Sequence, residues 1–219
     1  MKSFWATFLS RKYSFLISDV LTRIPLDAPT EKKLCLTFDD GPTTEELPEI
    51  LNILEEHEIQ ALFFLQGTNA QKNPSLVKEL IARNHTLGNH SYSHVDLWKS
   101  SAREGIRELN QGTNILEDIS GKSLHWMRPP YGRMTPWLIK WARKKKQQIM
   151  LWDTMPPDFD QNSTPNLLHK CMTTGIRPGS IICLHDNPVA SKVTPELLKQ
   201  ALPELIDEGW TFEIPQNSF

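Results

Sequence analysis

The 219-residue sequence has few cysteines and almost no net charge, and each shortage excludes a class of protein. Its three cysteines, Cys35, Cys171 and Cys183, are too sparse for a disulfide framework, and no CxxC pair is present for a cysteine-ligated zinc. Cys35 and Cys183 lie within apolar runs, which is typical of buried cysteines that pack as small hydrophobic residues. The formal net charge of -2, with Arg143–Lys146 as the nearest approach to a basic run, gives no support for nucleic-acid binding.

The sequence also has no hydrophobic run long enough to span a bilayer. A basic pair, Arg11 and Lys12, interrupts the apolar stretch near the N-terminus and no small-residue cleavage site follows, so no usual signal peptide is predicted. Apolar side chains recur there at helical spacing, namely Trp5, Leu9, Tyr13, Leu16 and Val20. We therefore expect residues 1–30 to form an amphipathic helical segment that packs on the rest of the domain or lies on a membrane surface.

Glycine-rich phosphate loops of the GxGxxG or GxxxxGK type are absent as well, which argues against a nucleotide-binding fold. Short β-like runs alternate instead with helical patterns, which predicts one α/β domain with a largely parallel sheet, either a closed barrel or an open doubly wound sheet. The predicted strands are Lys33–Asp39, Ala61–Gln66, Thr86–Asn89, His125–Pro129, Gln148–Asp153, Ser180–His185 and Trp210–Ile214. The predicted helices are Glu45–His57, Ser75–Asn84, Ala102–Ile119, Pro136–Lys145, Pro165–Thr174 and Pro195–Glu208.

Polar clusters follow the predicted strands at the points where the strands end. These clusters are Asp39-Asp40, His90–His94, Arg128–Gly132, Trp152–Phe159 and Leu184–Asn187. The carboxyl ends of the strands in a parallel α/β barrel form a single face, and that face carries the active site. Chemically distinctive clusters that share this kind of position therefore predict one catalytic site.

Asp40, His90 and His94 have the composition of a catalytic zinc site. Two imidazoles and one carboxylate leave a coordination position open for water. His90 and His94 are four residues apart, so one helical turn would point both rings the same way. A cation at Asp40 would also offset the repulsion between the adjacent carboxylates of Asp39 and Asp40. Asp39 would then be free to act as a general base, with Arg128 placed to hold it ionised.

The motifs TFDDGP, HSYSH, RPPYG, WDTMPPDF and IICLHD occur in the order that is typical of one family. In these motifs the sequence resembles the polysaccharide deacetylases with a NodB homology domain, carbohydrate esterase family 4. The similarity runs from Lys33 to Ile214, so residues 31–219 are expected to form a NodB-type deacetylase barrel. The resemblance implies an α/β fold that is a distorted, incomplete (β/α) barrel of about seven parallel strands.

The resemblance also implies an activity and a cofactor. The activity is hydrolysis of N-acetyl groups from amino-sugar glycans of the chitooligosaccharide or peptidoglycan type. The cofactor is a divalent metal, first of all Zn²⁺, with Co²⁺, Mn²⁺ or Ni²⁺ as alternatives. Asp39 resembles the catalytic base of the family and Arg128 the catalytic arginine paired with it, while the metal ligands correspond to Asp40, His90 and His94.

Two further catalytic roles and a substrate-binding set follow from the same resemblance. His185 resembles the general acid that protonates the leaving amine, and Asp158 resembles the aspartate that orients and charges this histidine. Asp153 is a rival for the second role because the spacing in that motif varies. The residues implied in substrate binding are Pro129, Tyr131, Phe159 and Leu184. Among them, the Tyr131 N–H would help to hold the oxyanion, Leu184 would line the acetyl pocket, and Phe159 stands where the family often has tryptophan.

Other functions on the same barrel stay open at this point. They are an O-acetyl xylan esterase, a small-molecule amidohydrolase, and a non-catalytic glycan-binding module. We expect an acetylated glycan as the partner, no nucleic acid, no transmembrane segment and a monomeric chain. The lack of a usual signal peptide indicates a cytoplasmic or membrane-peripheral protein, whereas a glycan substrate would suggest export.

Overall fold

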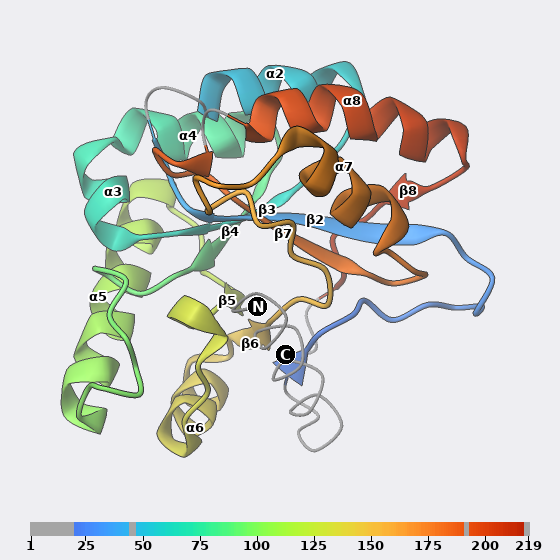
Figure 1. Ribbon diagram of the computed structural model, residues 1–219. Helices are drawn as coiled ribbons and strands as arrows, with labels where there is room; N and C mark the ends of the chain where they lie inside the picture. The colour runs from blue at the N-terminus through green and yellow to red at the C-terminus, as the bar shows by residue number, and fades with distance from the viewer. Residues whose placement is uncertain (1–19, 44–46, 191–192, 217–219) are drawn as a thin grey trace.

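The computed structural model describes residues 20–43, 47–190 and 193–216 (Figure 1). Most of the predicted amphipathic helix, residues 1–19, lies outside this range. The expected helical segment is wrong for its last part, because Val20–Leu21 forms strand β1 and pairs in parallel with the strand that begins at Gln148. A backbone that completes the edge of a sheet gains inter-strand hydrogen bonds, and this outweighs the weak helical periodicity of the local sequence.

The centre of the molecule is a curled sheet in which seven strands are parallel and follow the order β1-β6-β5-β4-β3-β2-β7. The strands are β1 (Val20–Leu21), β2 (Lys33–Asp40), β3 (Leu62–Leu65), β4 (Thr86–Asn89), β5 (Trp126–Met127), β6 (Gln148–Met150), β7 (Ile181–His185) and β8 (Thr211–Phe212). Among the described residues, the two ends of this sheet are joined by isolated bridges, Arg23 with Ser180 and Thr154 with Ile182, and not by a continuous strand ladder. The expected incomplete (β/α) barrel of parallel strands is therefore confirmed.

The last predicted strand does not take the place that its sequence position suggests. β8 lies off the main strand path and pairs with Lys33 and Leu34 of β2. β7 covers β2 only from Cys35 to Asp39, so the first two residues of β2 stay available for another strand. The seventh strand of the barrel is instead β1, which the sequence pattern did not indicate.

Helices surround the outer side of the sheet, as Figure 1 shows, and their bounds agree closely with the predicted ones. They are α2 (Leu47–Glu56), α3 (Gly67–Lys72), α4 (Pro74–Ala82), α5 (Ala102–Ser120), α6 (Pro136–Lys145), α7 (Pro165–Thr174) and α8 (Thr194–Asp207), with a 3₁₀ turn at Pro130–Gly132. The short α3 was not predicted. Side-chain caps explain why several helices begin where the sequence indicates: the hydroxyls of Ser101, Thr135 and Thr164 accept hydrogen bonds from the first turns of α5, α6 and α7.

The strands divide their side chains between two hydrophobic clusters. Leu36, Phe38 and Leu184 belong to a cluster that the sheet shares with α2, α4, α7 and α8. Cys35 and Cys183 belong to a second cluster, which combines other strand residues with residues of α5 and α6. Successive side chains of a strand point to opposite faces, so a shift of one residue moves a side chain from one cluster to the other. This alternation decides which residues reach the catalytic face at the carboxyl end of the barrel.

Candidate active site

The polar clusters at the ends of the strands meet at the carboxyl end of the barrel. Asp39 and Asp40 end β2, His90 directly follows β4, Arg128 directly follows β5 and His185 ends β7. β2 pairs with β7 in a register that sets Asp39 beside His185. The structure thus brings the predicted catalytic and metal-ligating residues into one site.

Arg128 fixes Asp39 inside the barrel. The guanidinium is fully buried and its Nη1 donates to Asp39 Oδ1 at 2.7 Å, forming an ion pair with a carboxylate that is itself 3% exposed. Its remaining donors are also used: Nε donates to the Met150 carbonyl and Nη2 to the Leu151 carbonyl, both at 3.0 Å. The guanidinium carbon lies 4.2 Å from the centre of the Phe64 ring. Because every contact orients Arg128, the Asp39 oxygens have a defined position.

Asp40 faces the two histidines from the end of β2. Its Oδ1 lies 3.3 Å from His94 Nε2 and 3.7 Å from His90 Nε2. Gln66 donates to Oδ1 and Asn187 donates to Oδ2, each at 2.9 Å. Burial alone would raise the pKa of Asp40, but the charges of the neighbouring histidines and the bond from Asn187 hold it below its ordinary value. The carboxylate therefore stays ionised and points its oxygens at the imidazoles.

A loop, and not the predicted helical turn, brings His90 and His94 together. Ser91 and His94 have left-handed backbone conformations, with φ of 66° and 58°, so the four-residue helical spacing has no role here. The loop is held by its own polar groups: the Ser91 N–H donates to Asn89 Oδ1 at 2.8 Å and the His94 N–H donates to Ser91 Oγ at 3.0 Å. Unfavourable backbone conformations of this kind persist only where surrounding contacts over-determine them.

Both imidazoles present a nitrogen lone pair to Asp40. His90 Nδ1 lies 2.8 Å from the Arg128 carbonyl oxygen, which can only accept, so Nδ1 carries the proton and Nε2 is left as an acceptor. Burial lowers the pKa of His94 to about 4, so its ring is neutral at pH 7. A neutral imidazole oriented through its other ring nitrogen is the usual form of a metal ligand.

His185 is paired with Asp158 and not with Asp153. Its Nδ1 lies 2.7 Å from Asp158 Oδ1, its backbone N–H donates to Asp158 Oδ2 at 2.8 Å, and Thr194 Oγ1 donates to the same oxygen at 2.9 Å. Asp153 instead accepts from Arg177 Nε at 3.0 Å. Burial acts to lower the pKa of His185, but the charge of Asp158 and the hydrogen bond to it raise it to about 9.

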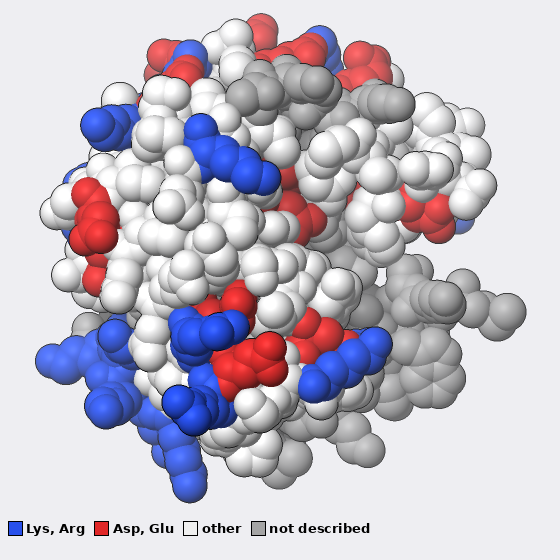
Figure 2. Space-filling model, turned by 90° about the vertical axis from the view of Figure 1, so that its left-hand side faces the viewer, with Lys and Arg blue, Asp and Glu red and all other residues white. Residues whose placement is uncertain are grey.

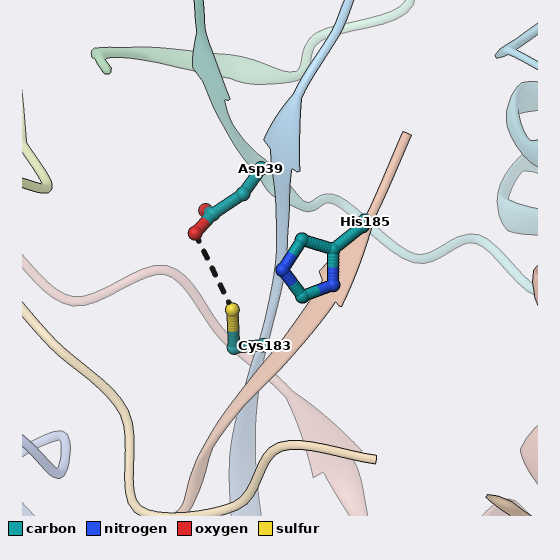
Figure 3. Close-up of side chains that lie close together, drawn as sticks. All are labelled: Asp39, Cys183 and His185. Carbon is teal, nitrogen blue, oxygen red and sulfur yellow. Dashed lines mark hydrogen bonds between the residues drawn. The ribbon is translucent and has the colours of Figure 1, made fainter. Parts of the chain in front are cut away.

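Cys183 is a residue of the site that the sequence interpretation assigned only to the core. Figure 3 shows its thiol beneath Asp39 and beside His185, with Sγ donating to Asp39 Oδ2 at 3.4 Å. Arg128 Nη1 also lies 3.4 Å from this sulfur. Burial and the charge of Asp39 raise the pKa of the Cys183 thiol well above its ordinary value, so the group stays protonated and donates. The signal that could have found it is its position two residues before His185 on one strand.

The alternation of side chains along β7 also corrects the prediction that Leu184 lines the acetyl pocket. It lies between Cys183 and His185 on β7, is fully buried, and packs in the cluster beneath the outer helices. Its side chain therefore points away from the catalytic face, and the structure does not place it where it could line an acetyl pocket.

The other predicted substrate-binding residues flank the site. The Tyr131 ring packs edge-on against His94 with centroids 4.7 Å apart, and the Phe159 ring packs edge-on against His185 at 5.1 Å. Tyr131 is 57% exposed and Phe159 is 38% exposed, so both aromatic rings are available to a ligand. Pro129 is buried and precedes the 3₁₀ turn that carries Tyr131.

The donor set formed by Asp40, His90 and His94 fits a divalent cation. In the part of the chain that the structure describes, two groups bring three ligand atoms within 4.8 Å of one another: Asp40 with His90 and His94, and Asp39 with Cys183 and His185. The second group contains a protonated thiol and a carboxylate already paired with Arg128, both of which oppose a cation. The first group has two imidazole nitrogens and one carboxylate, the composition of catalytic zinc sites.

Comparison with known proteins agrees with this geometry. Residues 27–150 match the family model described as polysaccharide deacetylase. The chain belongs to the polysaccharide deacetylase family. It is 33% identical to a peptidoglycan-N-acetylglucosamine deacetylase of Bacillus cereus over 82% of this chain, and it spans 66% of that relative's length. It is also 28% identical to a chitooligosaccharide deacetylase of Sinorhizobium fredii, over 91% of this chain and 98% of the relative.

A solved member of the polysaccharide deacetylase family has the same fold. The Bc1960 peptidoglycan N-acetylglucosamine deacetylase, crystallised with a hydroxybenzamide ligand, superposes with a TM-score of 0.83 at 30% identity, covering 89% of this chain and 90% of that one.

Among the described residues, no helix has the length and apolar character needed to cross a membrane. Figure 2 shows charged side chains of both signs on one face, with Lys and Arg gathered in its lower part and acidic side chains beside them.

Proposed function

We propose that this chain is a metal-dependent deacetylase that removes N-acetyl groups from amino-sugar glycans of the chitooligosaccharide or peptidoglycan type. The observation that carries the proposal is the arrangement of two distinct proton-transfer groups around one candidate metal triad. Asp39, held by Arg128, lies 3.8 Å from His90 Nε2, while His185, charged by Asp158, lies beside Asp39 in the neighbouring strand. Membership of the polysaccharide deacetylase family and the names of its relatives support the same assignment.

Asp40, His90 and His94 would hold the metal ion, with Zn²⁺ as the first choice. When bound, such an ion lowers the pKa of a coordinated water and polarises a carbonyl. Gln66 and Asn187 orient the Asp40 oxygens, and the Arg128 carbonyl fixes the tautomer of His90. Outer partners of this kind orient the ligands, and their loss typically costs about 10–100-fold in metal affinity or activity.

Asp39 and His185 divide the proton transfers of amide hydrolysis. Asp39 takes a proton from the attacking water while the water oxygen bonds to the acetyl carbon. The Tyr131 N–H and a cation held by the triad would stabilise the negative charge that develops on the carbonyl oxygen. His185 then gives its proton to the sugar nitrogen as the C–N bond breaks, so that acetate and a free amine leave. An amine is a poor leaving group without this proton, which explains why a histidine with a raised pKa stands there.

Acetate release from acetylated glycans, measured with and without added Zn²⁺, tests this function. Chitotetraose, peptidoglycan fragments, acetylated xylan and an acetylated small amine separate the candidate substrates. We expect release from the amino-sugar glycans, dependent on metal, and no release from any substrate would contradict the proposal.

The substitution Asp39→Asn tests the assignment of the base. It should keep the bound metal and lower kcat by about 10²–10⁴-fold, the usual contribution of a general base. Asp118→Asn on the exposed face of α5 is the matched control and should change neither quantity. Loss of metal in Asp39→Asn would show that the two adjacent aspartates have been assigned in the wrong order.

A further inference from the structure

Two aromatic side chains beside the site are unusually exposed. Trp98 is 50% exposed and Tyr131 is 57% exposed, the highest values among the exposed large hydrophobic residues in the described part of the chain. Both rings contact one guanidinium: the Arg133 carbon lies 5.1 Å from the Trp98 ring centre and 5.2 Å from the Tyr131 ring centre. Exposed apolar surface of this kind, bordered by polar side chains, is typical of a ligand-binding surface.

Hydrogen bonds hold this aromatic pair in place. The Trp98 indole N–H donates to the Met134 carbonyl at 2.8 Å, and the Trp98 backbone N–H donates to Asp96 Oδ1 at 3.1 Å. The other oxygen of Asp96 accepts from Arg133 Nη1 and balances its charge. The indole, the guanidinium and the carboxylate therefore form a fixed unit, and a ligand that stacks on it pays little ordering entropy.

The aromatic pair is continuous with the candidate metal triad. Tyr131 contacts Arg133 on one side and packs against His94 on the other, with ring centroids 4.7 Å apart. Trp98 is therefore connected to Tyr131, and through it to His94, by the Arg133 guanidinium. Phe159 packs against another residue of the site, His185.

From this continuity we propose that Trp98, supported by Arg133 and Asp96, forms a subsite that stacks against a second sugar ring of the glycan. The inference rests on the proposed deacetylase function and deepens it, because it requires an oligomeric substrate. A pyranose ring has a face of C–H bonds that packs on an aromatic ring, while its hydroxyl groups stay at the edge. Binding energy from such a remote ring positions the reacting sugar.

Direct binding tests the subsite apart from turnover. In the Asp39→Asn background, where turnover is slowed about 10²–10⁴-fold, calorimetry would compare N-acetylglucosamine with N-acetylated chitotetraose. We expect Trp98→Ala to weaken tetramer binding about tenfold, in line with aromatic stacking on ring ligands, and to leave monomer binding nearly the same. Trp98→Phe keeps a stacking ring and should recover most of the affinity. Leu167→Ala, which removes another exposed apolar side chain on α7, is the control.

Peptidoglycan tetrasaccharide forms a second arm. Stacking on the pyranose face predicts the same loss for this ligand as for chitotetraose, because both contain linked N-acetylated pyranose rings. Equal affinity of Trp98→Ala and the parent for both tetramers would overturn the subsite, as would equal weakening of monomer and tetramer. Acetate release from chitotetraose by the unsubstituted protein distinguishes the failures: if it persists while Trp98→Ala binds normally, the deacetylase assignment stands and only the subsite falls.

Discussion

The contact between Asp158 and His185 gives a prediction whose size follows from the structure. A rise of the His185 pKa from 6.5 to about 9 corresponds to about 3 kcal/mol of preference for the imidazolium in the folded chain. Burial opposes that charge, so the preference comes chiefly from Asp158, at 2.7 Å from the ring nitrogen, with smaller contributions from Asp40 and Asp39. The substitution Asp158→Asn keeps the shape of the side chain and removes its charge. We expect the His185 pKa to fall from about 9 in this variant, because the charges of Asp40 and Asp39 alone then oppose burial.

The sign of the effect on stability follows from proton linkage. The folded pKa of His185 lies above its unfolded value, so its stabilisation is complete below pH 6.5 and is lost as pH rises through about 9. The difference in unfolding free energy between the unsubstituted chain and Asp158→Asn should therefore narrow by up to about 3 kcal/mol over this range. Guanidinium unfolding of the metal-free proteins at pH 6, 7, 8 and 9.5 measures the difference.

Histidine ring NMR measures the same pKa directly, with the His185 signal assigned by its absence in His185→Gln. Asp153→Asn is the matched control, because it neutralises another buried carboxylate that contacts Arg177 and not His185. Asp153→Asn should leave the pKa of His185 unchanged. A His185 pKa at or below 6.5 in the unsubstituted metal-free chain, or a stability difference that is constant with pH, would refute the reasoning.

Three other substitutions test separate contacts of the site. His94→Ala should lower the bound Zn²⁺, measured by elemental analysis after dialysis, because it removes one of three ligands; unchanged stoichiometry would exclude His94. Cys183→Val should lower kcat about three- to tenfold with KM unchanged, since only the thiol donor to Asp39 is lost. Cys183→Ser, which supplies a hydroxyl donor, should restore kcat. Equal kcat in the valine and serine variants would contradict a donor role. Gly112→Ala should lower the free energy of unfolding by about 1–3 kcal/mol, measured by chemical unfolding, because the added Cβ would lie 2.8 Å from the Ser91 carbonyl. Unchanged stability would show that the loop around Ser91 shifts to make room for it.

The sequence by itself determined which elements form and where the chemistry gathers. Strand and helix periodicity are local properties, and the capping hydroxyls of Ser101, Thr135 and Thr164 are local too, so the order of elements was predictable. In a parallel barrel every strand ends at the same face. A polar cluster at a strand end therefore reveals its place in the site before any contact is known.

Contacts between distant segments were decided only by the tertiary structure. The sequence indicates Asp158 as the partner of His185 through the family resemblance but leaves Asp153 as a rival. The path of the chain between β6 and α7 turns Asp158, and not Asp153, toward the imidazole. His90 and His94 converge through left-handed residues in a loop, a conformation that packing imposes against local preference.

Strand register and edge pairing explain the remaining differences between the predictions from sequence and the structure. The pairing of β2 with β7 sets the Cys183 thiol against Asp39 and, one residue further along, turns Leu184 toward the outer helices. The edge of the sheet takes β1 because Val20 and Leu21 find partners in β6, more than a hundred residues away. Such pairings depend on the free energy of the whole fold, and no local pattern in the sequence encodes them.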